Sequence, residues 1–182
     1  GMIRDLFKEV LDLDLGDFPH MPYAEAMNRY GSDKPDLRIP IRMKVVCEHF
    51  RGAGFSLFAK ILKEPGTQVR AIPAPGGGTR RFAEKMDAFA RAEGLAGMGY
   101  ILWRDGAEGI EGAGPIAKAL GAEAVEELRA ELGLGAGDAA FFCAGWPETF
   151  ETVAAKARVE IGRALKRGAC VTRMDKLHVI VG

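Results

Sequence analysis

The largest concentration of chemically useful side chains lies between Tyr30 and Arg38. Four charged residues and a serine occupy this segment: Ser32, Asp33, Lys34, Asp36 and Arg38. Lys34 or Arg38 can be positioned against an anion, or both can pair with the aspartates and fix a loop beside an active site. The residue types alone favour a third interpretation, a solvated loop in which Ser32 and Asp33 bond to the nearby backbone.

A glycine-rich run from Pro75 to Arg81 is the second candidate site. Glycines let backbone amides approach a ligand, and a helix N-terminus favours anions, so Arg80, Arg81 and the nearby Lys85 predict a contact with an anion such as a phosphate of RNA. However, the run is neither a Walker loop nor GxGxxG, and it lacks the P-loop lysine. A strand-to-helix turn with a Thr79 cap is the simpler interpretation.

A long amphipathic helix opening at Pro147 is the third candidate, because basic residues gather on one side of its C-terminal half. They are Lys156, Arg158, Arg163, Lys166 and Arg167. The favourable interaction of cations with a helix C-terminus explains much of this bias. A stripe that faces RNA is the alternative.

The remaining titratable residues form no catalytic or metal-binding pattern. His20, His49 and His178 are scattered, and none has a metal-ligand spacing with another histidine, cysteine or aspartate. Glu108 and Glu111 lie in a glycine-rich segment, which favours a mobile surface over an acid–base pair. The three cysteines are odd in number and far apart, which argues against a disulfide framework and structural zinc. We therefore expect no metal site and no catalytic residue.

The charge balance limits the partners of the chain. Lysine plus arginine equals aspartate plus glutamate at 25 each, so the formal net charge is zero, whereas a free-standing nucleic-acid binder usually carries a basic excess. Contact with a nucleic acid would then be local or made by a partner domain. We expect a cytoplasmic protein, because the cysteine usage fits a reducing compartment and no apolar run is long enough to cross a membrane.

Hydrophobic periodicity and turn residues divide the chain into helices and strands. Helices are predicted over 2–13, 20–30, 79–93, 114–120, 122–132 and 147–166. Strands are predicted over 41–46, 55–62, 68–73, 99–103, 139–144 and 177–181, the last without an obvious partner. The Pro65–Gly66 turn suggests a hairpin, and 104–114 is predicted to be a flexible loop. This order predicts an α+β fold, a two-layer sandwich of a mostly antiparallel sheet with helices on one face.

The run PYAEAMNRYGSDKPDLR at residues 22–38 closely resembles the bacterial aspartyl-tRNA synthetase family. The preceding IRDLFKEVL at 3–11 is similar to the family helix that leads into it. Later segments resemble the GAD domain inserted into the catalytic core of that family: FSLFA (55–59), QVRAIPAPGG (68–77), GMGY (97–100), GPIAK (114–118) and GDAAFF (137–142). The resemblance covers roughly residues 2–168.

This resemblance implies a parent enzyme of class II that activates aspartate with ATP and Mg²⁺ and esterifies the 3′ end of tRNA. The parent would be a cytoplasmic homodimer. Residues 1–40 would belong to its catalytic domain and 41–168 to the GAD domain, an α+β unit with two related halves. Residues 169–182 would return to the catalytic domain, but LHVIVG at 177–182 replaces the aromatic strand expected there.

The motifs that carry catalysis in that family do not occur in this sequence. No motif-two or motif-three pattern and no anticodon-binding barrel is present, so no residue that binds aspartate, ATP or magnesium is assigned. We expect an accessory domain, monomeric and inactive by itself. The alternatives are a free-standing RNA-binding module and a tRNA-dependent amidotransferase B subunit, which also carries a GAD domain but is disfavoured by the Gly31–Arg38 loop. The sequence leaves open whether the parent also charges asparagine tRNA.

Overall fold

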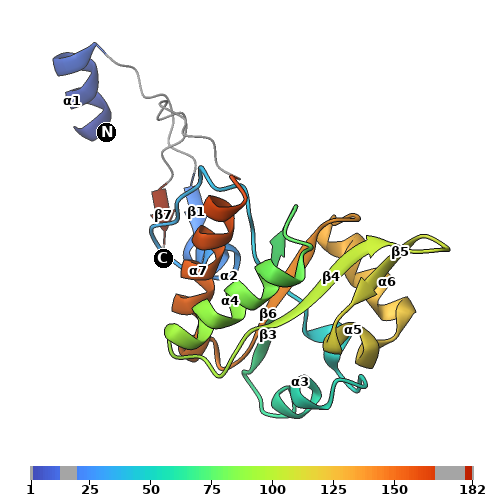
Figure 1. Ribbon diagram of the computed structural model, residues 1–182. Coiled ribbons are helices and arrows are strands. Elements are labelled where there is room, and N and C mark those ends of the chain that lie inside the picture. Colours follow the sequence, from blue (N-terminus) through green and yellow to red (C-terminus); the bar gives the residue numbers. More distant parts are fainter. Residues whose placement is uncertain (1, 13–19, 167–178, 182) are drawn as a thin grey trace.

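A five-stranded antiparallel sheet forms the centre of the computed structural model, which describes residues 2–12, 20–166 and 179–181 (Figure 1). The strand order is β2–β3–β6–β4–β5, and every neighbouring pair is antiparallel. These strands span Lys44–Val45 (β2), Gln68–Ala74 (β3), Gly99–Asp105 (β4), Ile110–Ala113 (β5) and Ala139–Gly145 (β6). The α+β class and the antiparallel sheet predicted from the sequence are therefore confirmed.

The helices agree with the predicted ones to within a few residues, except for one that the sequence analysis missed. They lie at Met2–Leu11 (α1), Tyr23–Tyr30 (α2), Ser56–Ile61 (α3), Arg80–Ala92 (α4), Pro115–Leu120 (α5), Ala122–Leu132 (α6) and Pro147–Ala164 (α7), with a 3₁₀ turn at Cys47–Phe50 (η1). The predicted cap of α4 is present, because the Thr79 hydroxyl accepts a hydrogen bond from the Phe82 amide at 3.2 Å.

The central strand β6 carries apolar side chains on both faces of the sheet, so helices are required on both faces. Its successive residues Phe141 and Phe142 point to opposite faces, and both are buried. Helices α4 and α7 cover the face that carries Phe141, while η1, α3, α5 and α6 cover the face that carries Phe142. The prediction of helices on one face only is therefore wrong, because each face of β6 must be removed from water.

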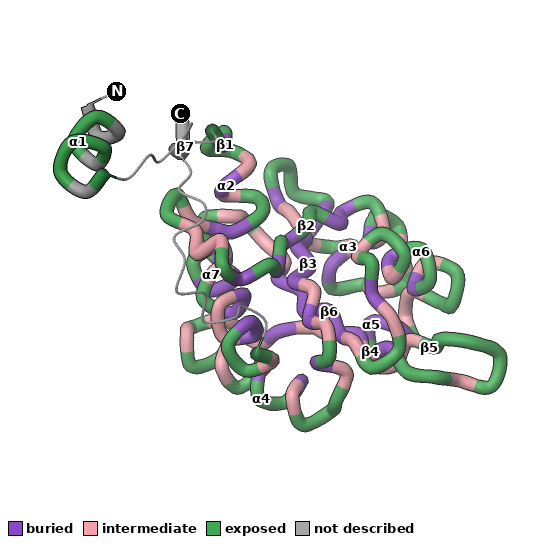
Figure 2. The backbone as a smooth tube through the Cα atoms, turned by 90° about the horizontal axis from the view of Figure 1, so that it is seen from above, coloured by how far each residue is buried: buried purple, intermediate pink, exposed green. Residues whose placement is uncertain are grey.

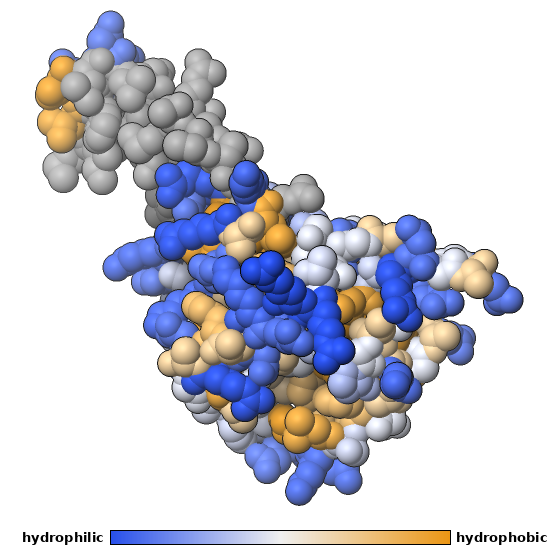
Figure 3. Space-filling view, in the orientation of Figure 1, coloured by the Kyte–Doolittle hydropathy of each residue, from blue (hydrophilic) through white to orange (hydrophobic). Residues whose placement is uncertain are grey.

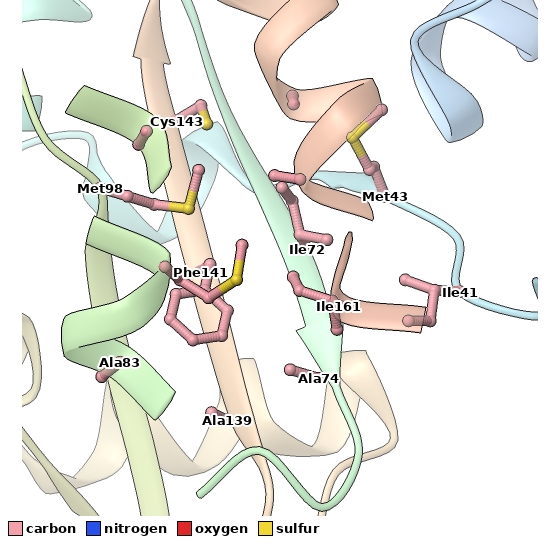
Figure 4. Close-up of a cluster of buried hydrophobic side chains, with 14 of the residues drawn as sticks. Ile41, Met43, Ile72, Ala74, Ala83, Met98, Ala139, Phe141, Cys143 and Ile161 are labelled. Atoms are coloured by element: carbon pink, nitrogen blue, oxygen red, sulfur yellow. The ribbon is translucent and has the colours of Figure 1, made fainter. Parts of the chain in front are cut away.

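Buried residues concentrate along β3 and β6, as Figure 2 shows. Figure 4 shows the cluster beneath α4 and α7, in which Ile72 of β3, Phe141 of β6 and Ile161 of α7 lie close together. The register of β3 on β6 runs from Gln68 opposite Gly145 to Ala74 opposite Ala139. The strands β3 and β6 therefore contribute buried side chains to the clusters on both faces of the sheet. The division of the GAD domain into two related halves stays a prediction.

Two predicted elements are wrong. The segment 55–62, predicted to be a strand, contains helix α3 (Ser56–Ile61), in which the ring of Phe58 packs edge-on against Phe55 and Phe50 at centroid distances of 4.8 and 5.1 Å. No hairpin therefore forms at Pro65–Gly66. The segment 104–114 is not a loop, since β4 continues to Asp105 and turns at Gly106–Gly109 into the edge strand β5. Most of the side chains of β5 are polar or small, so its sequence resembles a loop.

A separate pair of parallel strands joins the two ends of the chain. Residues His20–Pro22 (β1) pair with Val179–Val181 (β7), in the register His20 opposite Val179. The sequence analysis predicted a strand at 177–181 without a partner, and it placed that partner inside a helix starting at His20. The rest of the predicted return segment, 169–178 and 182, lies outside the described residues. The chain therefore leaves this small sheet after Pro22 and returns to it at Val179, on the neighbouring strand and opposite His20 (Figure 1).

Helix α2 ends at Gly31, which adopts a left-handed conformation with φ of 68° and donates its amide to Met27 O at 2.9 Å. Gly31 also lies directly against α7. A Cβ atom at this position would be 2.8 Å from the carbonyl oxygen of Glu151 and 2.9 Å from the Cβ of Ala155. The glycine thus serves both the end of α2 and the close approach of the two helices.

We expect Gly31→Ala to destabilise the fold more than the matched variant Gly133→Ala. Gly133, which ends α6, has a φ of 65° but open space around the added Cβ, so only backbone strain of about 1 kcal/mol is expected there. Gly31→Ala adds the clash with α7 and should lose at least about 2 kcal/mol. Urea unfolding of the 182-residue chain measures both, and equal losses would contradict the close packing of α2 on α7.

Candidate functional site

The segment Ser32–Arg38, here called the signature loop, is held partly by its own side chains. The carboxylate of Asp36 accepts two hydrogen bonds from the Arg38 guanidinium, both at 2.8 Å, and one from the Arg38 amide at 3.1 Å. The side chain of Arg38 holds the pKa of Asp36 below its usual value, mainly through these hydrogen bonds. Ser32 Oγ accepts a hydrogen bond from the Lys34 amide at 3.0 Å. Asp33 and Lys34 are exposed.

A buried arginine from α7 holds the same loop from the other side. Arg158 is 1% exposed, and its guanidinium donates hydrogen bonds to three backbone carbonyls. Its acceptors are Asp36 O (3.0 Å), Ile39 O (3.1 Å) and Ile41 O (3.0 Å). The guanidinium carbon also lies 5.0 Å from the centre of the Tyr30 ring, a cation–π distance. Because the residues 31–43 contain no helix or strand, these carbonyls depend on Arg158 for their donors.

A second buried arginine ties the end of α2 to the sheet. Arg70 of β3 is 2% exposed and donates to Met27 O at 3.0 Å and to Asn28 Oδ1 at 3.3 Å. It also lies 3.6 Å from a carboxylate oxygen of Glu151 and over the ring of Phe150. Met27 O also accepts from the Gly31 amide, and a carbonyl at a helix C-terminus can accept a further hydrogen bond from such a cation. Arg70 and Arg158 together fasten residues 27–41 to the sheet and to α7.

Two hollows flank the signature loop. One, of about 710 Å³, lies between the N-terminal segment and the end of α6. Its lining includes His20 and Met21 of β1, Leu37, Ile39–Arg42 and Leu132–Leu134. The other, of about 430 Å³, lies between the loop and helices α4 and α7, and its lining includes Ser32 and Lys34. The loop therefore forms a wall between the two hollows.

The glycine-rich run does not form an anion site, because its backbone amides are already bonded within the protein. The amides of Gly76, Gly77 and Gly78 each have an acceptor, which are respectively Asp138 Oδ1 (2.7 Å), Ala74 O (2.9 Å) and Gly137 O (2.9 Å). A carboxylate thus occupies the position that an incoming phosphate would need. The run acts as the strand-to-helix turn between β3 and α4.

The basic residues that follow this run are largely paired. Arg80 lies 3.0 Å from Glu84, and Lys85 lies 2.7 Å from Glu160 of α7. Arg81 is exposed. Figure 3 shows a mainly hydrophilic surface in this region, over α4 and α7. Nearby carboxylates balance Arg80 and Lys85, so this surface lacks the cationic excess typical of a strong RNA contact.

The histidines and cysteines of the described residues do not assemble a reactive centre. His49 bonds Glu131 at 2.6 Å, and Lys44 lies 3.2 Å from the same carboxylate. Burial raises the pKa of Cys143 to about 12, so its thiol stays protonated at neutral pH. Within 2–12, 20–166 and 179–181, no three metal-ligating side chains come together. His178 and Cys170 lie outside these ranges. In the same ranges, no helix has the length and apolar character required to span a membrane.

The sequence analysis missed the two arginines that organise this site. It placed Arg158 on the basic side of α7, although Arg158 follows Ala154 by four positions and precedes Ile161 by three, and so lies on the core stripe. Arg70 lies on β3 between the apolar residues Val69 and Ala71. A cation at a core position is the signal that would have identified both residues as buried ties.

The sequence pattern of the GAD domain family matches residues 58–154. An aspartate–tRNA(Asp/Asn) ligase of Paracoccus denitrificans is 66% identical over 150 residues, and one of Cereibacter sphaeroides (strain ATCC 17025) is 61% identical over 150 residues. Each alignment covers 82% of this chain and 25% of the relative. A third, from a Jannaschia species, is 55% identical over 166 residues, which is 90% of this chain and 28% of the relative. The chain therefore spans about a quarter of the length of these relatives.

We expect Asp36→Asn to remove an acid-sensitive part of the stability. The pKa of folded Asp36 lies below its unfolded value of about 3.9. The Asp36–Arg38 pair therefore stabilises the fold above that pH, and its contribution is lost as the pH falls through the folded pKa. The Asp36 and Arg38 side chains are 30% and 65% exposed, so the effect should stay below about 1 kcal/mol.

The measurement is urea unfolding of the chain at neutral pH and at about pH 3. Asp36→Asn should lower the free energy of unfolding at neutral pH and flatten its decline in acid. Asp33→Asn removes a charge from the same loop without touching the Arg38 pair, and it serves as the control. An identical pH profile for wild type and Asp36→Asn would refute the pair's contribution.

Proposed function

The chain belongs to the GAD domain family, and we propose that it is the inserted domain of an aspartate–tRNA ligase together with adjoining parts of the catalytic domain. The observation that carries the proposal is the 55–66% identity to aspartate–tRNA(Asp/Asn) ligases across at least four-fifths of the chain. The resemblance of residues 22–38 to the same family supports it. On this proposal the complete protein joins aspartate to tRNA, and the names of the relatives extend its substrates to asparagine tRNA.

We assign residues 1–40 to the catalytic domain, 41–168 to the GAD insertion and 169–182 to the return into the catalytic domain. The neighbouring positions of β1 and β7 support this assignment, because inserted domains leave and re-enter their hosts at adjacent points. On α1, the apolar side chains of Leu6 and Val10 are exposed, which favours packing against the remainder of the catalytic domain. The parent would be a cytoplasmic homodimer, and this chain alone a monomer.

The chemistry of the complete protein would lie outside this chain. ATP and Mg²⁺, when bound to the parent, supply activation of the aspartate carboxylate. The described residues contribute positioning instead: the signature loop is braced by Asp36 and Arg38 from within and by Arg158 from α7. We therefore infer that the domain is accessory and that the 182-residue chain binds neither ATP nor aspartate by itself.

The proposal predicts different activities for the complete protein and for this chain. The full-length protein should support aspartate-dependent exchange of pyrophosphate into ATP, whereas the 182-residue chain should show none. The two should be assayed side by side with asparagine as the control amino acid. Clear exchange by the isolated chain would overturn the accessory role, and absence of aspartate-dependent exchange in the full-length protein would overturn the proposed ligase.

A free-standing RNA-binding module is the second candidate function, and one observation favours it. Arg81 is exposed at the start of α4, near Arg80 and Lys85. We propose that these three residues would provide the tRNA contact of such a module. The ion pairs of Arg80 with Glu84 and of Lys85 with Glu160 limit its strength, because each paired cation releases fewer counterions on meeting a phosphate.

Titration of the chain with tRNA at low and high salt tests this contact. We expect no salt-sensitive binding at micromolar concentrations for the wild-type chain, because two of the three cations are paired. A Glu84→Gln/Glu160→Gln variant frees Arg80 and Lys85 and should bind more tightly at low salt, whereas adding Arg81→Ala should weaken it again. Salt-sensitive micromolar binding by the wild-type chain would favour the RNA-binding module over the accessory domain.

A further inference from the structure

We propose that Arg158 is a positioning residue of the parent enzyme, through which the inserted domain holds the signature loop of the catalytic segment in its working conformation. The inference rests on the proposed function and deepens it. The signature loop belongs to the proposed catalytic segment, whereas Arg158 belongs to α7 of the insertion, more than a hundred positions later in the sequence. A direct contact between the two parts gives the insertion a way to act on the catalytic segment.

The geometry of the contact is that of a clamp. One guanidinium nitrogen of Arg158 bridges Ile39 O and Ile41 O at 3.1 and 3.0 Å, and the other reaches Asp36 O at 3.0 Å. The planar guanidinium places several donors in fixed directions, which a lysine ammonium does not do. One carbonyl of the loop, at Asp36, and two that follow it, at Ile39 and Ile41, therefore share one rigid donor group. The end of the loop cannot change its path without breaking these bonds.

The burial of Arg158 makes the clamp act in both directions. Its side chain is 1% exposed and carries a charge, and a buried cation without acceptors is strongly unfavourable. The carboxylate of Asp36 makes its hydrogen bonds to Arg38 rather than to Arg158, and only its negative charge acts on the Arg158 guanidinium. The backbone carbonyls accept from both terminal nitrogens of the guanidinium and the Tyr30 ring lies against it, whereas the buried Nε atom has no hydrogen-bond partner among the described residues. Displacement of the loop would thus leave both the carbonyls and the cation of α7 without partners.

The loop is placed where its position matters for the catalytic domain. The hollow of about 710 Å³ is lined both by β1, at His20 and Met21, and by Leu37 and Ile39–Arg42. On the proposed function, β1 is part of the catalytic domain. The loop therefore lies between α7 of the insertion and the catalytic side of the chain. Errors of about 1 Å in the placement of catalytic elements lower rates by about 100-fold, so release of the loop should affect the chemical step.

Arg158→Met in the full-length protein tests the inference, because methionine keeps an apolar stem in the core and removes every donor. We expect kcat for aspartate-dependent pyrophosphate exchange to fall at least about tenfold, with the Kd for tRNA changed less than about twofold. Arg158→Lys should recover part of the rate, since an ammonium can reach some of the carbonyls. An unchanged kcat in Arg158→Met, or a loss of tRNA affinity without a change in kcat, would overturn the inference.

Leu128→Ala is the control for a general loss of stability. Leu128 is fully buried in α6, on the opposite face of the sheet from α7, and its truncation destabilises the core without touching the loop. At a temperature where circular dichroism shows all variants to be folded, Leu128→Ala should keep the wild-type kcat. A fall equal to that of Arg158→Met would mean that Arg158 acts only through stability, and it would also overturn the inference.

Hydrogen exchange separates this inference from the proposed function. In the 182-residue chain, Arg158→Met should increase amide exchange across residues 33–41 at least about tenfold, while Leu128→Ala should leave these residues less affected than α6. Unchanged exchange in the loop would refute the clamp itself, whatever the enzyme does. If the wild-type full-length protein shows no aspartate-dependent exchange, the proposed function fails, and the hydrogen-exchange result still decides whether Arg158 holds the loop.

Discussion

A guanidinium that is removed from water must find acceptors, and this requirement fixes the junction between the two parts of the chain. Arg70 and Arg158 are both buried, and both donate hydrogen bonds to residues 27–41. The acceptors of Arg158 are backbone carbonyls, whereas Arg70 donates to Met27 O and to the side-chain oxygens of Asn28 and Gln68. The apolar packing of α4 and α7 on the sheet provides the stability of the fold, but it has little directional preference. The hydrogen bonds of the two arginines supply the direction, and they determine where α2 and the signature loop lie relative to the sheet.

Elements with a single dominant apolar face were predictable from the sequence. Helices α4 and α6 have clear apolar periodicity with a cap or a terminal glycine, and their observed bounds agree closely with the predicted ones. Helix α3 was not predictable from alternation, because Phe55 and Phe58 fit a short strand as well as one helical turn until their partner Phe50 is known. The edge strand β5 was missed because half of its residues face solvent and have no apolar pattern to reveal them.

The candidate site was harder to predict from the sequence than the helices and strands. Its residue types identified the signature loop and the glycine-rich run, but types alone could not tell which charges were already paired. Asp138 lies 62 positions from Gly76, and Arg158 lies 122 positions from Asp36. Such contacts depend on the tertiary fold. The bond from Gly76 to Asp138 excludes an anion site at the glycine-rich run, whereas Arg158 supports the signature loop. The family resemblance, by contrast, rested on contiguous residues, and the comparison with known proteins agreed with it.

The pairing of β1 with β7 has a consequence for the ancestry of the insertion. The two strands run parallel, with His20 opposite Val179 and Pro22 opposite Val181. A tight turn cannot link parallel strands, because the chain must travel back along the whole strand, and such a link usually needs a dozen or more residues. A shorter ancestor with the same two strands would therefore have required a crossover segment here. On the domain assignment proposed above, the GAD insertion would be an enlarged form of such a crossover.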